Sequence, residues 1–132
     1  MYAEIILDYY HNPPNKGIIP NSDFKARDVN PLCGDVVEIY LNFGPEEQDQ
    51  NTLDNMDTRR IITKASFNGC GCAISQAAAS MLAEHLVGKT LEQARSISKE
   101  EVLSLLGVPI SYARLKCALL AWAVVRGYKI EI

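Results

Sequence analysis

Hydrophobic and polar positions alternate over one stretch of the chain. Over residues 36–43 the alternating hydrophobic side chains are Val37, Ile39 and Leu41. This period of two is typical of a half-buried antiparallel strand. Residues 60–67 are rich in β-branched side chains and predict the returning strand. The polar, acidic segment 44–60 between them is interpreted as a long hairpin connection, because its carboxylate spacing does not fit a calcium loop.

Elsewhere the hydrophobic positions repeat with the period of a helix. The predicted helices cover residues 1–10, 73–87, 91–97, 99–106 and 111–127. Thr90 and Ser98 each precede an amide or carboxylate side chain by three residues, as helix N-caps do. Residues 18–30 show no period, and we predict an extended loop there. The order of elements predicts an α+β fold, in which a small antiparallel sheet carries helices packed on one face.

Composition and charge limit the class of protein. With 132 residues, 48% of them hydrophobic, the chain fits a single domain over residues 1–132. The net charge of −3 and the scattered basic residues argue against a nucleic-acid partner. No apolar run reaches the roughly 18–20 residues of a membrane span, and no signal peptide is recognisable, so we expect a cytoplasmic protein with no membrane partner. In that reducing compartment, four cysteines are better interpreted as metal ligands or nucleophiles than as disulfides.

Three of the four cysteines lie at junctions between predicted elements. Cys33 precedes a strand, Cys72 precedes a helix, and Cys117 falls near the start of the last helix. Such junctions can converge at one end of a layered domain. Unpaired N–H groups and the helix dipole at a helix N-terminus stabilise negative charge, which favours thiolates at Cys72 and Cys117.

A carboxylate accompanies the first of these cysteines. Asp35 follows Cys33 by two residues, and Gly34 between them lets both side chains point to one place. Three thiolates and one carboxylate can hold zinc tetrahedrally or complete the terminal ligands of a [2Fe–2S] cluster, and residue type alone does not separate the two. Cysteines that are merely small buried residues are the simpler alternative. A catalytic thiol with a histidine partner is weakly supported, because His11 and His85 fit surface or core packing.

The segments around the cysteines carry a family resemblance. NPLCGD at 30–35, GCAIS at 71–75 and ARLKCALLAW at 113–122 resemble the three cysteine motifs of the iron–sulfur scaffold family that comprises IscU, SufU and the NifU N-terminal domain. The opening segment, ILDYY at 6–10 through NKG at 15–17, is similar too. The resemblance covers nearly the whole chain except the acidic segment 44–60, which is longer than usual.

The resemblance implies an α+β fold with a site at one end, built from Cys33, Asp35, Cys72 and Cys117. It also implies that sulfur arrives as a persulfide from a pyridoxal-phosphate cysteine desulfurase. In the cluster-building branch such a protein assembles a [2Fe–2S] cluster and passes it to apo iron–sulfur acceptor proteins, and a homodimer with the cluster bound is among the states it allows. In the SufU branch the protein holds zinc and acts as a sulfurtransferase that relays the persulfide sulfur.

Two features favour different branches. Lys116 stands where the IscU branch has a histidine, and Arg114 with Trp122 matches the SufU pattern. Against this, the extra segment that SufU carries before its last cysteine motif is missing, because the stretch 88–117 is short. We give the missing segment more weight, since single side chains change more easily than a whole insertion. No proline-rich chaperone-docking motif is recognisable near Pro109. The leading expectation is a [2Fe–2S] scaffold, and the alternative is a zinc-bound sulfurtransferase.

Cys70 is an addition to the family pattern. Alignment from Phe67 onward puts Cys72 at the ligand position and leaves Cys70 two residues earlier. One interpretation is a spare thiol in a glycine-rich turn. The other is an additional metal ligand or a persulfide acceptor, since Gly71 gives the chain the freedom to turn back toward the same metal. The sequence leaves both interpretations open.

Overall fold

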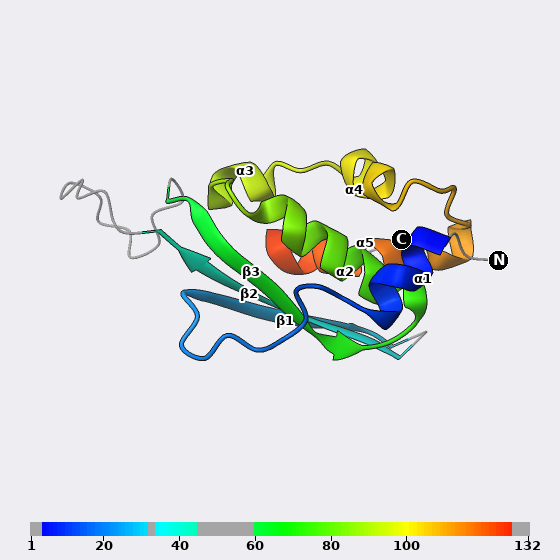
Figure 1. Cartoon of the computed structure of the whole chain (residues 1–132). Coiled ribbons are helices and arrows are strands. Elements are labelled where there is room, and N and C mark those ends of the chain that lie inside the picture. The colour runs from blue at the N-terminus through cyan, green and yellow to red at the C-terminus, as the bar shows by residue number, and fades with distance from the viewer. Residues whose placement is uncertain (1–3, 32–33, 45–59, 128–132) are drawn as a thin grey trace.

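A three-stranded antiparallel sheet forms the base of the molecule (Figure 1). In this computed structural model, which describes residues 4–31, 34–44 and 60–127, the strands are β1 (Phe24–Asn30), β2 (Asp35–Phe43) and β3 (Ile62–Cys70), in the order β1-β2-β3. In the register, Asn30 pairs with Asp35 and Val36 pairs with Cys70. The end of β1, the start of β2 and the end of β3 therefore meet at one edge of the sheet.

All five helices of the described residues lie on one face of this sheet (Figure 1). They are α1 (Glu4–His11), α2 (Ala73–Leu86), α3 (Leu91–Arg95), α4 (Lys99–Leu106) and α5 (Leu115–Arg126). Helices α2 and α5 pack directly on the strands and on each other, α1 packs on α2, and α4 packs on both. This arrangement confirms the expected α+β class with helices on one sheet face. None of the described helices combines the length and the apolarity that crossing a bilayer requires.

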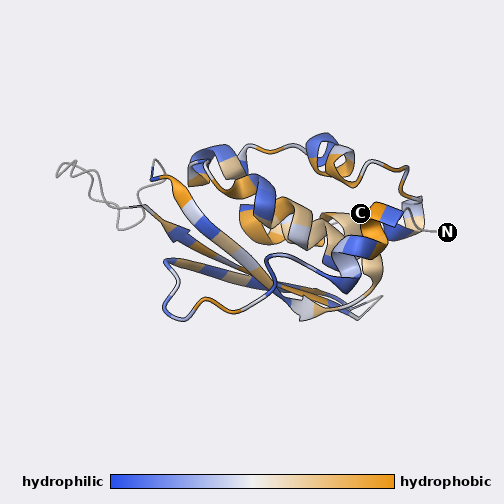
Figure 2. Cartoon of the chain, viewed as in Figure 1, coloured by the Kyte–Doolittle hydropathy of each residue, from blue (hydrophilic) through white to orange (hydrophobic). Residues whose placement is uncertain are grey.

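The core forms where the predicted hydrophobic face of β2 meets α2 and α5. Val37, Ile39 and Leu41 are fully buried against residues of both helices. Burying each such side chain contributes about 1.5–3 kcal/mol, which is enough to hold the helical layer on the sheet. Figure 2 shows mostly pale to orange residues along α5 and hydrophilic residues on the outward turns of α3 and α4.

Both predicted helix N-caps are present. The hydroxyl of Thr90 accepts a hydrogen bond from the N–H of Gln93, whose side chain in turn accepts one from the N–H of Thr90. Ser98 caps α4 by accepting from the N–H of Glu101. These caps start α3 and α4 where the sequence placed them.

The structure corrects several predicted boundaries. Residues 24–30 were expected in a loop but form β1, because they pair with β2 along their whole length. Strand β3 continues past residue 67 to Cys70, where it still pairs with β2. Smaller differences are that α1 extends to His11, α2 and α3 end at Leu86 and Arg95, and a 3₁₀ turn (Tyr112–Arg114) precedes α5. Most of the acidic connection predicted at 44–60 and the first three residues of the first predicted helix lie outside the described residues.

Candidate metal centre

Three of the predicted ligands come together at the edge where the strand ends meet. A carboxylate oxygen of Asp35 and the sulfur atoms of Cys72 and Cys117 all lie within 4.8 Å of one another. Asp35 begins β2, Cys72 directly precedes α2, and Cys117 lies in the first turn of α5. Residues far apart in sequence therefore share one site because β2, α2 and α5 all begin at this end of the fold.

Cys72 is the N-cap residue of α2. Its backbone is extended, with φ −70° and ψ 164°, and its Sγ accepts a hydrogen bond of 3.5 Å from the N–H of Ser75. The sulfur therefore lies at the N-terminus of α2. The Cys72 side chain is partly exposed, and the other two residues of the group are buried. Cys72 is thus the member of the group that solvent can reach.

Asp35 is fully buried, and hydrogen-bond donors surround its carboxylate. Oδ1 accepts from the N–H of Cys72 at 2.9 Å and from the hydroxyl of Ser75 at 3.2 Å. Oδ2 accepts from Nδ2 of Asn30 at 3.4 Å. A buried carboxylate is costly unless it is paired or hydrogen-bonded, and these donors supply that compensation.

Gly71 is required beside this carboxylate. A Cβ at this position would lie 2.4 Å from Oδ1 of Asp35 and 2.8 Å from Oγ of Ser75. The backbone φ of +153° also disfavours any residue with a side chain. The glycine lets the chain between β3 and α2 pass close to Asp35, so that the N–H of Cys72 reaches the carboxylate.

Cys117 is buried between the helices and the sheet edge. Its neighbours in the hydrophobic cluster include Ile6, Ile74 and Ala118. Its Sγ lies 3.9 Å from Nδ2 of Asn30, within the range of an N–H···S hydrogen bond. The same amide nitrogen therefore contacts both Asp35 and Cys117.

A second amide adjoins the site on α2. Gln76 is buried, and its Nε2 donates to Oγ of Ser75 at 3.3 Å. The Ser75 hydroxyl has one proton, which can point to Oδ1 of Asp35 at 3.2 Å or to the carbonyl oxygen of Cys72 at 3.0 Å. Oε1 of Gln76 is buried and has no hydrogen-bond partner among the described residues. The carboxylate thus sits at one end of a chain of polar side chains that runs into α2.

The predicted ligands divide into three cases. Asp35, Cys72 and Cys117 come together, whereas Cys33 lies outside the described residues. Cys70 does not belong to the group: it is the exposed last residue of β3, rather than part of a turn as one interpretation assumed. The sequence reasoning missed Asn30 and Ser75 as supporting residues. Both lie inside the motifs NPLCGD and GCAIS, which was the available signal.

The donor set fits a thiophilic metal. In a tetrahedral site with metal–sulfur bonds of about 2.3 Å, neighbouring ligand atoms are separated by about 3.8 Å. Atoms that already lie within 4.8 Å of one another can therefore close on one metal ion with shifts of about 1 Å or less. Two sulfurs with one oxygen suit zinc, and they equally suit iron at the edge of an iron–sulfur cluster.

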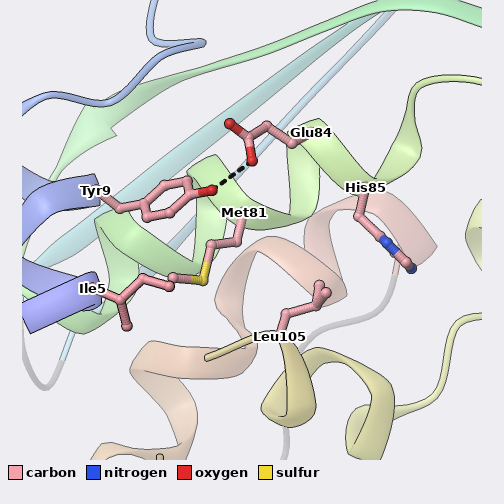
Figure 3. Close-up of a pocket in the computed structure, with 6 residues that line it drawn as sticks. All are labelled: Ile5, Tyr9, Met81, Glu84, His85 and Leu105. Atoms are coloured by element: carbon pink, nitrogen blue, oxygen red, sulfur yellow. Dashed lines mark hydrogen bonds between the residues drawn. The ribbon is translucent and has the colours of Figure 1, made fainter. Parts of the chain in front are cut away.

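A separate hollow of about 230 Å³ lies between α1, α2 and α4 (Figure 3). Its lining residues are Ile5, Tyr9, Met81, Glu84, His85 and Leu105. The Tyr9 hydroxyl donates to Oε2 of Glu84 at 2.7 Å, and this hydrogen bond is the main cause of the raised pKa of Tyr9. His85 Nε2 lies 2.9 Å from Oε2 of Glu101. Neither His85 nor His11, the last residue of α1, belongs to the metal-ligand group, as their assignment to packing or surface roles predicts.

The comparisons with known proteins agree with the fold and the motifs. Residues 1–128 match the family model of the NifU-like N-terminal domain. The zinc-dependent sulfurtransferase SufU of Bacillus subtilis is 32% identical, over 92% of this chain and 84% of SufU. The iron–sulfur cluster assembly scaffold protein IscU of Rickettsia prowazekii is also 32% identical, over 91% of this chain and 82% of IscU.

A solved structure extends the likeness to the fold. It is the crystal structure of a putative iron–sulfur cluster assembly scaffold protein for the SUF system from Fervidobacterium islandicum, with a TM-score of 0.69 and 26% sequence identity. The match covers 96% of this chain and 95% of that one. The chain therefore belongs to the family of NifU-like N-terminal domains, and the resemblance seen in its cysteine motifs is confirmed.

Proposed function

We propose that this protein is a scaffold for the assembly of a [2Fe–2S] cluster, which it passes on to apo iron–sulfur acceptor proteins. Sulfur arrives as a persulfide from a cysteine desulfurase, and the cluster is cargo held by Cys33, Asp35, Cys72 and Cys117. The observation that carries the proposal is the convergence of Asp35, Cys72 and Cys117 within 4.8 Å at the sheet edge. Such a site needs only this domain, in agreement with a family match that spans residues 1–128.

The geometry suits a site that must both hold and release its cargo. Of the three ligands that the structure describes, Cys72 is the partly exposed one, so that iron and sulfur can enter and an acceptor thiolate can approach there. Asp35 offers a hard oxygen, which binds iron more weakly than a thiolate does. An acceptor thiolate can displace this oxygen first, while the cysteines keep the cluster attached.

Zinc-dependent sulfur transfer is the second candidate, and a specific observation favours it. SufU is one of the relatives with 32% identity, Lys116 stands where the IscU branch has a histidine, and Arg114 with Trp122 matches the SufU pattern. In this function a cysteine thiolate attacks the outer sulfur of the desulfurase persulfide. The old S–S bond breaks, a new one forms on this chain, and the desulfurase cysteine leaves as a thiolate, with no net oxidation.

The short stretch 88–117 before the last cysteine motif favours the scaffold. The SufU branch carries an extra segment at this place, and a whole segment is gained or lost less easily than a single side chain changes.

A desulfurase-driven assembly assay separates the two functions. Metal-free protein is incubated anaerobically with ferrous iron, L-cysteine and a catalytic amount of a pyridoxal-phosphate cysteine desulfurase, and apo-ferredoxin is then added. The scaffold function predicts visible absorbance that grows on this chain and then moves to ferredoxin. Zinc-loaded protein that gains a persulfide but no chromophore, together with metal-free protein that forms no cluster, would show that the second function is correct.

A further inference from the structure

We propose that Asn30 is a positioning residue of the metal centre. Its side-chain amide holds the carboxylate of Asp35 and the sulfur of Cys117 at ligating separation, and it hydrogen-bonds to that sulfur when a metal is bound. This inference rests on the proposed ligand set, since it assigns a role to the residue between two of the ligands.

The position of Asn30 follows from the register of the sheet. Asn30 is the last residue of β1, and its Cα pairs with that of Asp35 at the start of β2. Strand β1 also packs against α5, which carries Cys117. The side chain is only 5% exposed, although asparagine is usually found at the surface. A buried amide at this point has to be satisfied by the groups around it.

The contacts of this amide identify what it does. Nδ2 lies 3.4 Å from Oδ2 of Asp35 and 3.9 Å from Sγ of Cys117. An amide nitrogen carries two hydrogens, so one can point to each acceptor. Both contacts are long, which leaves the amide room to follow either ligand atom as that atom moves toward a metal.

The two carboxylate oxygens of Asp35 have different hydrogen-bond partners. Oδ1 is engaged by two donors of the β3–α2 junction, the N–H of Cys72 and the hydroxyl of Ser75. Among the described residues, Oδ2 has one long contact, that with Asn30, and is the oxygen better able to bind a metal. Two negatively charged ligands repel each other strongly in a buried place, and a donor between them offsets that repulsion. Without Asn30, the carboxylate and the Cys117 sulfur would lose the donor that they share.

A hydrogen bond to a ligating sulfur also has a spectroscopic consequence. Donors of this kind reduce the electron density that the sulfur gives to the metal, and they tune the centre from outside the ligand set. The energy of the sulfur-to-metal charge-transfer band should therefore depend on Asn30. A residue that only stabilises the fold would not shift this band.

The test uses cobalt(II) and zinc(II) as probes of the whole chain. Asn30→Ala removes the donor, and Asn30→Leu keeps the size of the side chain without the amide hydrogens and without adding a metal ligand. The matched control is Asn42→Ala at the opposite end of β2, where the amide oxygen accepts from the N–H of Asp23 at 3.2 Å. Zinc affinity is measured by competition with a chromophoric chelator, the cobalt charge-transfer band by absorption, and folding by circular dichroism.

We expect both Asn30 variants to lose about 10–100-fold in zinc affinity, the range found when hydrogen-bond partners of metal ligands are removed. We also expect a shifted cobalt charge-transfer band, with both properties unchanged in Asn42→Ala. If Asn30→Ala does not fold, Asn30→Leu decides. A folded Asn30 variant with wild-type zinc affinity and an unshifted band overturns the role of Asn30 while leaving the ligand set intact. A wild-type protein without any cobalt–thiolate band overturns both the ligand set and this inference.

Discussion

Replacing Asp35 with alanine probes the two roles that its carboxylate combines. In the metal-free protein, Asp35→Ala removes the acceptor for the N–H of Cys72 at 2.9 Å and for Nδ2 of Asn30 at 3.4 Å. It also removes one of the two acceptors of the Ser75 hydroxyl, at 3.2 Å. It also leaves the N–H of Cys72 without its buried partner. In the loaded protein, the same change removes the weakest proposed ligand of the cluster.

The stability effect can be estimated from these contacts. A hydrogen bond to a charged group contributes about 1.5–3 kcal/mol, and one unpaired buried donor costs about 1–3 kcal/mol. The variant no longer has to bury a charged carboxylate, and this gain offsets part of the lost free energy of unfolding. We therefore expect the free energy of unfolding to fall by about 2–4 kcal/mol, and Tm to fall by about 10 °C. Asp35→Asn keeps an oxygen for the N–H of Cys72 and should lose about half as much.

Asp35→Ala should destabilise the fold but stabilise the bound cluster. Without an exchangeable oxygen ligand, the acceptor thiolate loses its point of entry, so we expect a longer-lived cluster and slower transfer to apo-ferredoxin. Urea denaturation of the metal-free variants gives the first effect, and the decay of visible absorbance with and without acceptor gives the second. Asp35→Asn is the matched control for shape. A destabilised Asp35→Ala protein whose cluster decays and transfers at the wild-type rate would mean that Asp35 only caps the start of α2.

Three further sets of substitutions test other parts of the structure. Replacing Cys33, Cys72 or Cys117 singly with alanine should abolish stable cluster binding. Cys70→Ala should keep the wild-type iron content, because the exposed thiol of Cys70 lies outside the metal-ligand group. Iron analysis of the four variants checks both expectations. Gly71→Ala should lower the free energy of unfolding by about 2–4 kcal/mol through overlap with Asp35 and backbone strain. The control is Gly88→Ala, where φ is +91° but no atom lies near the added Cβ, and the free energy of unfolding should fall by only about 1 kcal/mol. Equal losses for the two variants in urea denaturation would show that overlap with Asp35 does not matter. Trp122→Phe removes an indole N–H that donates a hydrogen bond of 2.7 Å to a buried carbonyl oxygen. Thermal denaturation should show that the free energy of unfolding falls by about 1–3 kcal/mol. An unchanged Tm would mean that this hydrogen bond does not stabilise the fold.

The elements that the sequence predicted well are those with a strong local signal. The alternation of β2, the helical stripe of α2 and the side-chain caps at Thr90 and Ser98 are each set by neighbouring residues. Strand β1 lacks such a signal. It is an edge strand whose inward positions include Asp28 and whose exposed positions include Val29, so only its pairing with β2 defines it.

For the site too, residues with a local sequence signal could be predicted, and residues that depend on long-range pairing could not. The ligand candidates Asp35, Cys72 and Cys117 could be named because thiolates and a carboxylate at element junctions have few other uses. Their supporting residues depend on long-range register: Asn30 meets Asp35 only through the β1–β2 pairing. The end of β3 was also missed, because Gly69 has a low strand propensity. The structure shows why a glycine stands there: a Cβ would lie 2.0 Å from the carbonyl oxygen of Val36.

The most direct test of the proposed function is the composition of the protein as cells make it. Wild-type protein and Cys117→Ala are purified without oxygen, and iron, acid-labile sulfide and zinc are measured per chain together with the visible spectrum. The account predicts brown wild-type protein with equal amounts of iron and sulfide, and a colourless variant. Colourless wild-type protein that holds one tightly bound zinc per chain and no sulfide would contradict it.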